Sequence, residues 1–276
     1  MRILVLGAGG VGGYFGGRLV EAGRDVTFLV RPRRAERLTA AGLTIRSPFG
    51  DVTLPQPRTV TADSVRGPYD LILLSCKAYD LDGAVEALAP AVGRETAVLP
   101  LLNGMRHLDV LDRRFGAGRV LGGLCLISAA LDGEGRILHL NELHTVVFGE
   151  RDGGATPRVA AVAAAFDGAL VDARASPAVL QEMWEKWVFI AALAGITCLM
   201  RAPVGDIVAA GAADLGIRLL DECAAIAGAE GFPPGAVAME RSRAMLTAPR
   251  SPLAASMLRD VEGGGPTEGS HIVGDL

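Results

Sequence analysis

Short runs of consecutive apolar residues alternate with amphipathic stretches through the first part of the chain. The first run covers residues 3–6. It is followed by the stretch 11–19, in which apolar positions recur every three or four residues, and by a second run at 25–30. Short runs rich in β-branched residues are typical of strands buried on both faces of a parallel sheet. Apolar positions three or four apart indicate one face of a helix. The order strand, helix, strand therefore predicts an α/β fold with parallel strands.

The same patterns predict further elements up to about residue 175, where only helices follow. We expect a hairpin from residues 43–46 and 51–54, strands at 71–76, 97–102, 120–131, 136–140, 145–150 and 170–172, and helices at 80–92 and about 156–167. Beyond them we expect the helices 179–200, 206–231, 235–247 and 252–261. The chain is thus predicted to form an α/β domain over 1–174 and a smaller all-helical domain over 175–276, with the substrate bound in the cleft between them.

Three glycines separate the first predicted strand from the first predicted helix. Gly7, Gly9 and Gly12 have the spacing G-x-G-x-x-G. In a dinucleotide-binding turn, the first glycine allows the tight turn, the second lets the backbone approach the pyrophosphate, and the third lets helix and strand pack closely. The helix start, with Gly10 and Val11, would offer free N–H groups to the anion. We predict an N-terminal Rossmann dinucleotide-binding domain; the alternative is a glycine-rich turn that binds nothing.

The end of the second predicted strand bears on which dinucleotide binds. NAD-dependent enzymes of this fold place an acidic residue there, which binds the ribose 2′-hydroxyl. This chain has Arg31 instead, followed by Arg33 and Arg34. Because a guanidinium pairs with phosphate through a planar fork, the pattern favours NADP, and Arg31 is the preferred candidate because it is nearest the strand end. The alternative is a solvated basic turn.

Composition and charge exclude several classes of function. The net charge is −4, which argues against binding to nucleic acid. The four cysteines are scattered without a C-x-x-C pair, and the four histidines form no metal-ligand cluster. Charges interrupt the apolar stretches, and Met1 leads directly into a strand without a signal-peptide pattern. We therefore expect a cytoplasmic protein with reduced thiols and with neither a nucleic-acid nor a membrane partner.

Two polar residues follow predicted strands of the parallel sheet. Lys77 ends the strand at 71–76, and Asn103 follows the strand at 97–102. Ligands of open parallel sheets bind outside the carboxyl ends of the strands, so both residues are candidates for the place where cofactor and substrate meet. Taken alone, Lys77 would be an ordinary strand-end lysine and Asn103 would belong to a turn.

Lys77, Asn103 with the two residues after it, and the segments 183–187 and 256–260 together resemble the ketopantoate reductase (2-dehydropantoate 2-reductase) family. The resemblance covers nearly the whole sequence. It implies a Rossmann domain followed by a helical domain, and the NADPH-dependent reduction of ketopantoate to pantoate on the route to pantothenate. The substrate expected from it is a small-molecule 2-oxo acid, and the candidate assembly is a homodimer.

The resemblance also implies roles for particular residues. Lys186 corresponds to the family's catalytic acid, and Glu268 to an active-site glutamate. Ser256 corresponds to a serine that binds the substrate, while Lys77 and Asn103 line the junction of cofactor and substrate. A proton donor suits this chemistry because hydride addition to a 2-oxo acid leaves an alkoxide. Without the resemblance, Lys186 reads equally well as a lysine that extends from a core helix to solvent.

Three features depart from the family. The family helix carries asparagines four and eight residues after the lysine, where this chain has Ile190 and Ala194. At helical spacing both residues share the face of Lys186, and they predict a drier substrate pocket. The glycine run at 263–265 predicts a flexible break that would hold Glu268 poorly. Family members usually continue with more helix where this chain ends at Leu276, so we expect the helical domain to be truncated.

Several alternatives for function stay open at this point. One is a reductase of a less polar 2-oxo acid or ketone, which Ile190 and Ala194 favour. A second is a non-catalytic sensor that binds NADP(H) without turnover. A flavoprotein is a weaker third alternative.

Overall fold

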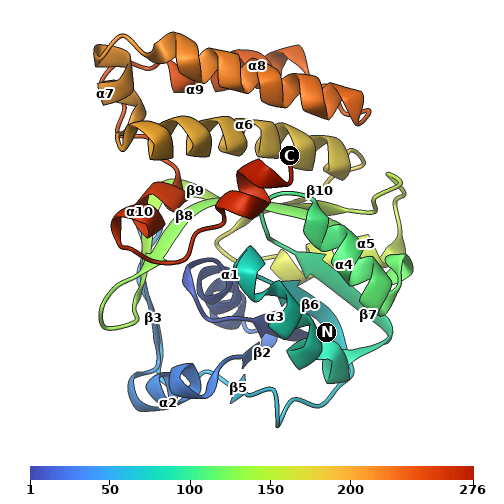
Figure 1. The fold of residues 1–276 in the computed structure, drawn as a ribbon. Helices are drawn as coiled ribbons and strands as arrows, with labels where there is room; N and C mark the ends of the chain where they lie inside the picture. Colours follow the sequence, from blue (N-terminus) through green and yellow to red (C-terminus); the bar gives the residue numbers. More distant parts are fainter. The chain divides into compact units, whose positions relative to one another are not determined.

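The computed structural model describes residues 1–276 and divides into two compact units. The first comprises Met1–Leu102 and His107–Val179. The second comprises Leu180–Leu276 together with the short segment Asn103–Arg106, which lies far upstream in the sequence. Unit 1 contains both sheets, and unit 2 is helical (Figure 1). This is the α/β architecture with a following helical part that the hydrophobic pattern predicts.

A five-stranded sheet forms the centre of unit 1. All of its pairings are parallel. Its spatial order is β5 (Thr59–Val60), β2 (Asp25–Leu29), β1 (Arg2–Leu6), β6 (Tyr69–Leu74) and β7 (Val92–Pro100). The chain leaves β1 toward β2 and later returns to the other side of β1 with β6. In doubly wound sheets, such a switch point is where a ligand binds at the carboxyl edge.

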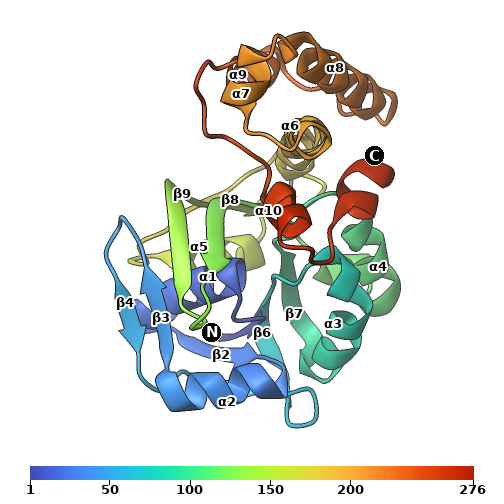
Figure 2. The same cartoon turned by 60° about the vertical axis from the view of Figure 1, so that its left-hand side comes forward.

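A second sheet contains the predicted hairpin of β3 (Leu43–Arg46) and β4 (Val52–Leu54), which pair in antiparallel fashion. A longer hairpin of β8 (Gly122–Leu131) and β9 (Ile137–Gly149) joins it (Figure 2). The expectation of two separate strands at 136–140 and 145–150 is wrong, because β9 is continuous. At a register shift between the two strands, the side-chain oxygen of Asn141 accepts a hydrogen bond of 2.9 Å from the Ser128 amide.

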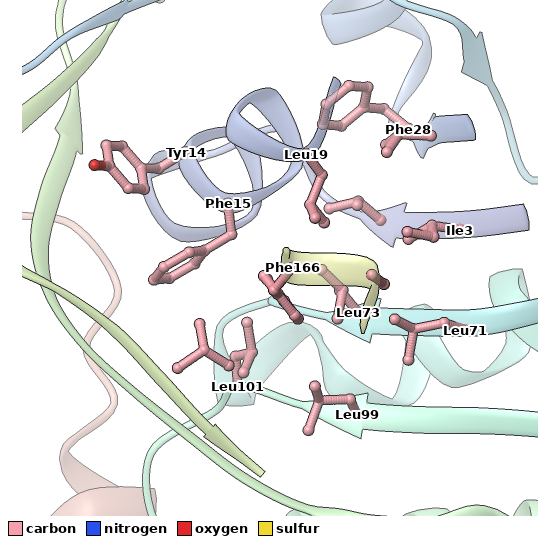
Figure 3. Close-up of a cluster of buried hydrophobic side chains, with 14 of the residues drawn as sticks. Ile3, Tyr14, Phe15, Leu19, Phe28, Leu71, Leu73, Leu99, Leu101 and Phe166 are labelled. Carbon is pink, nitrogen blue, oxygen red and sulfur yellow. The ribbon is translucent and has the colours of Figure 1, made fainter. Parts of the chain in front are cut away.

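Helices cover the central sheet of unit 1. They are α1 (Gly10–Glu21), α2 (Pro32–Ala41), α3 (Leu81–Leu88), α4 (Arg106–Phe115) and α5 (Pro157–Phe166), with 3₁₀ turns η1 (Ala78–Asp80), η2 (Ala89–Ala91) and η3 (Ala117–Arg119). Figure 3 shows Phe15 and Leu19 of α1 and Phe166 of α5 directed toward the side chains of the central strands. The strand β10 (Asp172–Ala175) pairs with β9 and begins two residues later than predicted.

Unit 2 consists of helices around its own apolar cluster. They are α6 (Val179–Met200), α7 (Val204–Ala209), α8 (Ala213–Ala229), α9 (Ala236–Leu246), α10 (Ser256–Glu262) and the C-terminal turn η4 (Ser270–Gly274). The helix predicted over 206–231 is broken at Gly211, whose positive φ of 75° ends α7. By length and composition α6 is long and apolar enough to cross a membrane, which the charge pattern was expected to exclude. Its apolar residues instead form the centre of the helical cluster.

The glycine run that follows α10 is an ordered helix end rather than the flexible break that we expected. The Gly263 amide donates to the Arg259 carbonyl at 2.9 Å, and the Gly265 amide donates to the Asp260 carbonyl at 3.0 Å. Gly264 has a φ of 66°, a conformation that glycine adopts without strain. Glu268 comes soon after this turn and is only 7% exposed. The expectation that Glu268 is poorly held is therefore wrong.

Candidate functional site

The turn from β1 into α1 has the geometry that a dinucleotide-binding turn requires. Gly7 has a φ of 92°, which few residues other than glycine adopt. A Cβ atom placed on Gly12 would overlap the Ser75 hydroxyl and the Gly7 carbonyl, so only glycine lets the helix pack this closely. At Gly9, by contrast, a Cβ would meet no atom within 4 Å. The backbone is thus open at the one glycine that a pyrophosphate would approach, and the residues fit a dinucleotide.

The first turn of α1 supplies hydrogen-bond donors at this place. Gly10 and Val11 begin the helix, and the first intrahelical bond runs from the Gly13 amide to the Gly9 carbonyl at 2.9 Å. The amides that precede Gly13 in the helix have no carbonyl one turn earlier to bind. Together with the helix dipole, they form a site that favours an anion.

Segments that follow β2 and β6 lie at the same edge of the sheet. Arg31 follows β2, and its guanidinium forms a 2.6 Å ion pair with Asp80. The Asp80 amide in turn donates to the carbonyl of Lys77 at 2.9 Å, so Lys77 and Arg31 are connected through one residue. The Ser75 hydroxyl donates to the Leu6 carbonyl at 2.7 Å and ties the end of β6 to the end of β1. The structure therefore brings together the glycine turn, Arg31 and the segment that carries Lys77.

Arg31 and Arg34 have different surroundings. The Arg31 side chain is 78% exposed, and its one ion pair is at the surface. Arg34 donates through Nε to the Ala8 carbonyl at 3.0 Å and through Nη1 to the Gly135 carbonyl at 2.9 Å. Burial, with a smaller contribution from the nearby charge of Arg37, lowers the pKa of Arg34 below its usual value. Arg34 thus binds a backbone carbonyl within the glycine turn, whereas Arg31 is the arginine with an accessible guanidinium.

In unit 2, α6 carries three of the predicted site residues on one face. Lys186, Ile190 and Ala194 lie four residues apart within a continuous helix, as the sequence predicts. Lys186 and Ile190 are half-buried, whereas Ala194 is 1% exposed and belongs to the apolar cluster. The face around Lys186 is therefore apolar along the helix.

The C-terminal turn connects α6 with the Asn103 segment. The Nε1–H group of Trp187, the residue after Lys186, donates to the Ile272 carbonyl at 2.9 Å. His271 Nε2 lies 2.6 Å from the Asn103 carbonyl. The carbonyl of Glu268 accepts from the Ile272 amide at 2.7 Å. Unit 2 thus gathers Asn103, Glu268 and the neighbour of Lys186 around one turn.

Ser256 lies near the C-terminal end of α6. It is exposed at the first position of α10, directly after Ala255. The Ala255 amide lies 3.4 Å from the Thr197 hydroxyl, which itself donates to the Leu193 carbonyl of α6 at 2.7 Å. Ser256 therefore starts its helix beside the turn of α6 that contains Ala194.

Sequence reasoning missed a polar group that lies beside the predicted residues. His271 Nδ1 is 2.9 Å from a carboxylate oxygen of Asp275, and the other oxygen of Asp275 forms a 3.1 Å ion pair with Arg106. The spacing of four residues between His271 and Asp275 is the only signal in the sequence. Nothing in the sequence relates either residue to Asn103, which lies 168 positions before His271.

Two models of one protein family match the chain. The model "Ketopantoate reductase PanE/ApbA" matches residues 3–153, and the model of the C-terminal part of this family matches 178–276. A Bacillus subtilis (strain 168) protein named uncharacterized oxidoreductase YkpB is 42% identical, over 100% of this chain and 91% of its own length. The 2-dehydropantoate 2-reductase of Halobacterium salinarum is 30% identical, over 99% of this chain and 90% of its own.

A solved structure of a 2-dehydropantoate 2-reductase has a similar fold. The crystal structure of 2-dehydropantoate 2-reductase from Geobacter metallireducens GS-15 superposes with a TM-score of 0.89 at 31% sequence identity. The match covers 99% of this chain and 90% of that one. Both units therefore have counterparts in one known enzyme.

The geometry of the glycine turn predicts different effects for two alanine substitutions, one on stability and the other on dinucleotide binding. Gly12→Ala should destabilise the protein by about 1–3 kcal/mol, because the added methyl group must displace backbone atoms. Gly9→Ala should change the free energy of unfolding by less than about 0.5 kcal/mol, since its Cβ enters open space. We expect Gly9→Ala instead to weaken dinucleotide binding. Urea denaturation and a fluorescence titration with NADPH measure the two effects, and equal destabilisation by both substitutions would contradict this account of the turn.

Proposed function

The chain belongs to the ketopantoate reductase family of dinucleotide-binding oxidoreductases, and from this premise we propose that it reduces a 2-oxo acid with NADPH. The first candidate substrate is 2-dehydropantoate (ketopantoate), which would place the enzyme in pantothenate biosynthesis. We further propose a cytoplasmic location and a homodimer as the working assembly.

One observation carries the proposal: a single turn ties Asn103 and Glu268 to the position next to Lys186. Trp187, His271 and the backbone carbonyl of Glu268 provide the hydrogen bonds. A lysine, an amide and a carboxyl group anchored to the same turn can orient a small acid and move a proton. The glycine turn and Arg31 in unit 1 add a fitting place for the dinucleotide.

The reaction requires a proton donor at the carbonyl oxygen of the substrate. The nicotinamide ring, when bound, supplies the hydride that adds to the carbonyl carbon. Lys186 would give a proton from its ammonium group to the oxygen, so that the alkoxide becomes a hydroxyl. Only two of the 27 basic lysine and arginine residues are lysines, and they are Lys77 and Lys186. Because an arginine keeps its proton at any physiological pH, a lysine is the side chain suited to this step.

Substitution of Lys186 tests the proposed function directly. Both Lys186→Ala and Lys186→Arg should lower kcat by roughly 10²–10⁴-fold, the range of a general acid, with the NADPH Kd nearly unchanged. Lys186→Arg is the sharper variant, because it keeps the positive charge but does not release a proton. NADPH oxidation at a fixed ketopantoate concentration measures the rate. An arginine variant with most of the wild-type kcat would assign Lys186 a purely electrostatic role, and wild-type protein inactive on every 2-oxo acid of a panel would contradict the proposed function.

Cofactor choice is proposed to depend on Arg31. Its exposed ion pair with Asp80 contributes at most about 1 kcal/mol, so a phosphate can replace Asp80 as the partner of the guanidinium. Arg31→Ala should therefore raise the NADPH Kd by roughly ten- to hundredfold, the effect of losing a charge-assisted contact, and should leave the NADH Kd nearly unchanged. Arg33→Ala removes a neighbouring exposed arginine and serves as the control. Equal use of both cofactors by the wild-type protein would show that Arg31 does not read the 2′-phosphate.

A less polar 2-oxo acid is the second candidate substrate, and Ile190 is the observation that favours it. Ile190 lies one turn from Lys186 on the same face and offers no hydrogen bond to a hydroxylated acid. A missing partner for a buried hydroxyl costs roughly 1–3 kcal/mol. If this second candidate is the substrate, ketoisovalerate is favoured over ketopantoate in kcat/KM, and Ile190→Asn shifts the ratio toward ketopantoate. The double variant with Ala194→Asn tests the next turn, although Ala194 is buried in the helical cluster. A strong ketopantoate preference, unmoved by either change, would exclude the less polar substrate.

A further inference from the structure

His271 occupies a central place in the hydrogen bonding of the C-terminal turn. It is 8% exposed, and both ring nitrogens have oxygen neighbours. Nε2 lies 2.6 Å from the carbonyl oxygen of Asn103, and Nδ1 lies 2.9 Å from a carboxylate oxygen of Asp275. The backbone amide of the same residue donates to the Glu268 carbonyl at 3.0 Å. One residue thus binds both Asn103 and the main chain of Glu268.

The chemistry of the neighbours fixes which atoms donate. A backbone carbonyl can only accept, so Nε2 carries a hydrogen and donates to Asn103. An ionised carboxylate also only accepts, so the contact with Asp275 is a hydrogen bond when Nδ1 carries a hydrogen as well. The 3.1 Å ion pair between Arg106 and Asp275 holds this carboxylate in place. Arg106 lies three residues after Asn103, so the chain of contacts leads from the Asn103 segment to the turn and back.

The backbone at Asn103 also depends on the His271 ring. Gly104 has a φ of 73°, and a Cβ there would lie 2.9 Å from Nε2. The segment therefore turns sharply against the face of the imidazole, and the Asn103 carbonyl points at its nitrogen. Because the carbonyl is fixed, the rotation of the Asn103 peptide is fixed, and the direction in which its side chain leaves the backbone follows from it.

We propose that His271, supported by Asp275 and Arg106, is a positioning residue that sets the orientation of Asn103 and holds it in a fixed relation to the backbone of Glu268. The inference rests on the proposed function, in which Asn103 and Glu268 act on the substrate. Small displacements of substrate-orienting groups can lower a rate by about two orders of magnitude. His271 itself needs no contact with the substrate to have this effect.

Two substitutions separate positioning from simple packing. His271→Leu fills similar space and removes both ring contacts. His271→Gln restores a side-chain N–H that can donate to the Asn103 carbonyl. His139→Leu is a matched control in unit 1, because His139 is also buried and its Nε2 also lies 2.9 Å from a backbone carbonyl, that of Leu143. All three variants are compared with the wild-type full chain.

Amide hydrogen exchange in peptides that cover residues 101–110 is the first measurement, and it needs no activity. His271→Leu should accelerate exchange there about tenfold, His271→Gln should recover most of the protection, and His139→Leu should leave this region unchanged even if it lowers Tm. Unchanged exchange in His271→Leu would overturn the proposal. If the wild-type protein reduces no 2-oxo acid, the proposed function fails, and the exchange result still decides whether His271 orders the Asn103 segment.

Steady-state kinetics are the second measurement. His271→Leu should lower kcat about 10- to 100-fold with the NADPH Kd within twofold of wild type, and His271→Gln should regain most of the rate. Because His271 is proposed to act through Asn103, adding His271→Leu to Asn103→Ala should lower kcat no further than Asn103→Ala alone. Multiplicative losses in the double variant, or a rate for His271→Gln no better than for His271→Leu, would contradict a positioning role and leave His271 as a packing residue.

Discussion

The close approach of α1 to its surroundings is the constraint on which unit 1 depends. A Cβ at Gly10 would lie 2.7 Å from the Ala129 carbonyl in β8, and one at Gly16 would lie 2.6 Å from the Phe28 ring in β2. Helix α1 therefore packs through its glycines against strands of both sheets, where any larger side chain would force them apart. This contact fixes the start of α1 at the carboxyl edge of the central sheet. The anion site at Gly9 is thus a consequence of packing, because the same glycines that join the sheets aim the helix N-terminus.

In unit 2, hydrogen bonds bring residues from distant parts of the sequence to one place. Asn103 and Glu268 are anchored through main-chain carbonyls, with His271 and the Ile272 amide as donors. Trp187 likewise binds a main-chain carbonyl. Anchors of this kind hold the backbone and do not use the amide of Asn103 or the carboxyl group of Glu268. The residues that hold the backbone at these positions therefore differ from the residues whose side chains are proposed to act on the substrate.

The sequence predicted those parts of the fold in which local pattern and packing agree. The glycine turn, the 43–54 hairpin and α6 follow directly from spacing and periodicity. The division of β9 into two strands was wrong because Asn141 interrupts the apolar pattern, although its side chain pairs with Ser128 across the hairpin. The helix predicted over 206–231 missed the break at Gly211, whose backbone conformation stops α7. The contacts of His271 could not be predicted, since they join positions 168 residues apart through main-chain atoms that carry no signature in the sequence.

Arginine and lysine have different uses in this chain. In this chain arginines hold structure: Arg34 binds two backbone carbonyls behind the glycine turn, and Arg106 fixes Asp275. A guanidinium suits such roles because it keeps its charge and presents several donors in a rigid plane. The same properties suit Arg31 to a phosphate, and they make arginine a poor proton donor. This chain uses arginine for nearly every positive charge and has lysine at only two positions, Lys77 and Lys186. Under the proposed function, the need to release a proton would account for a lysine at position 186, because an arginine keeps its proton.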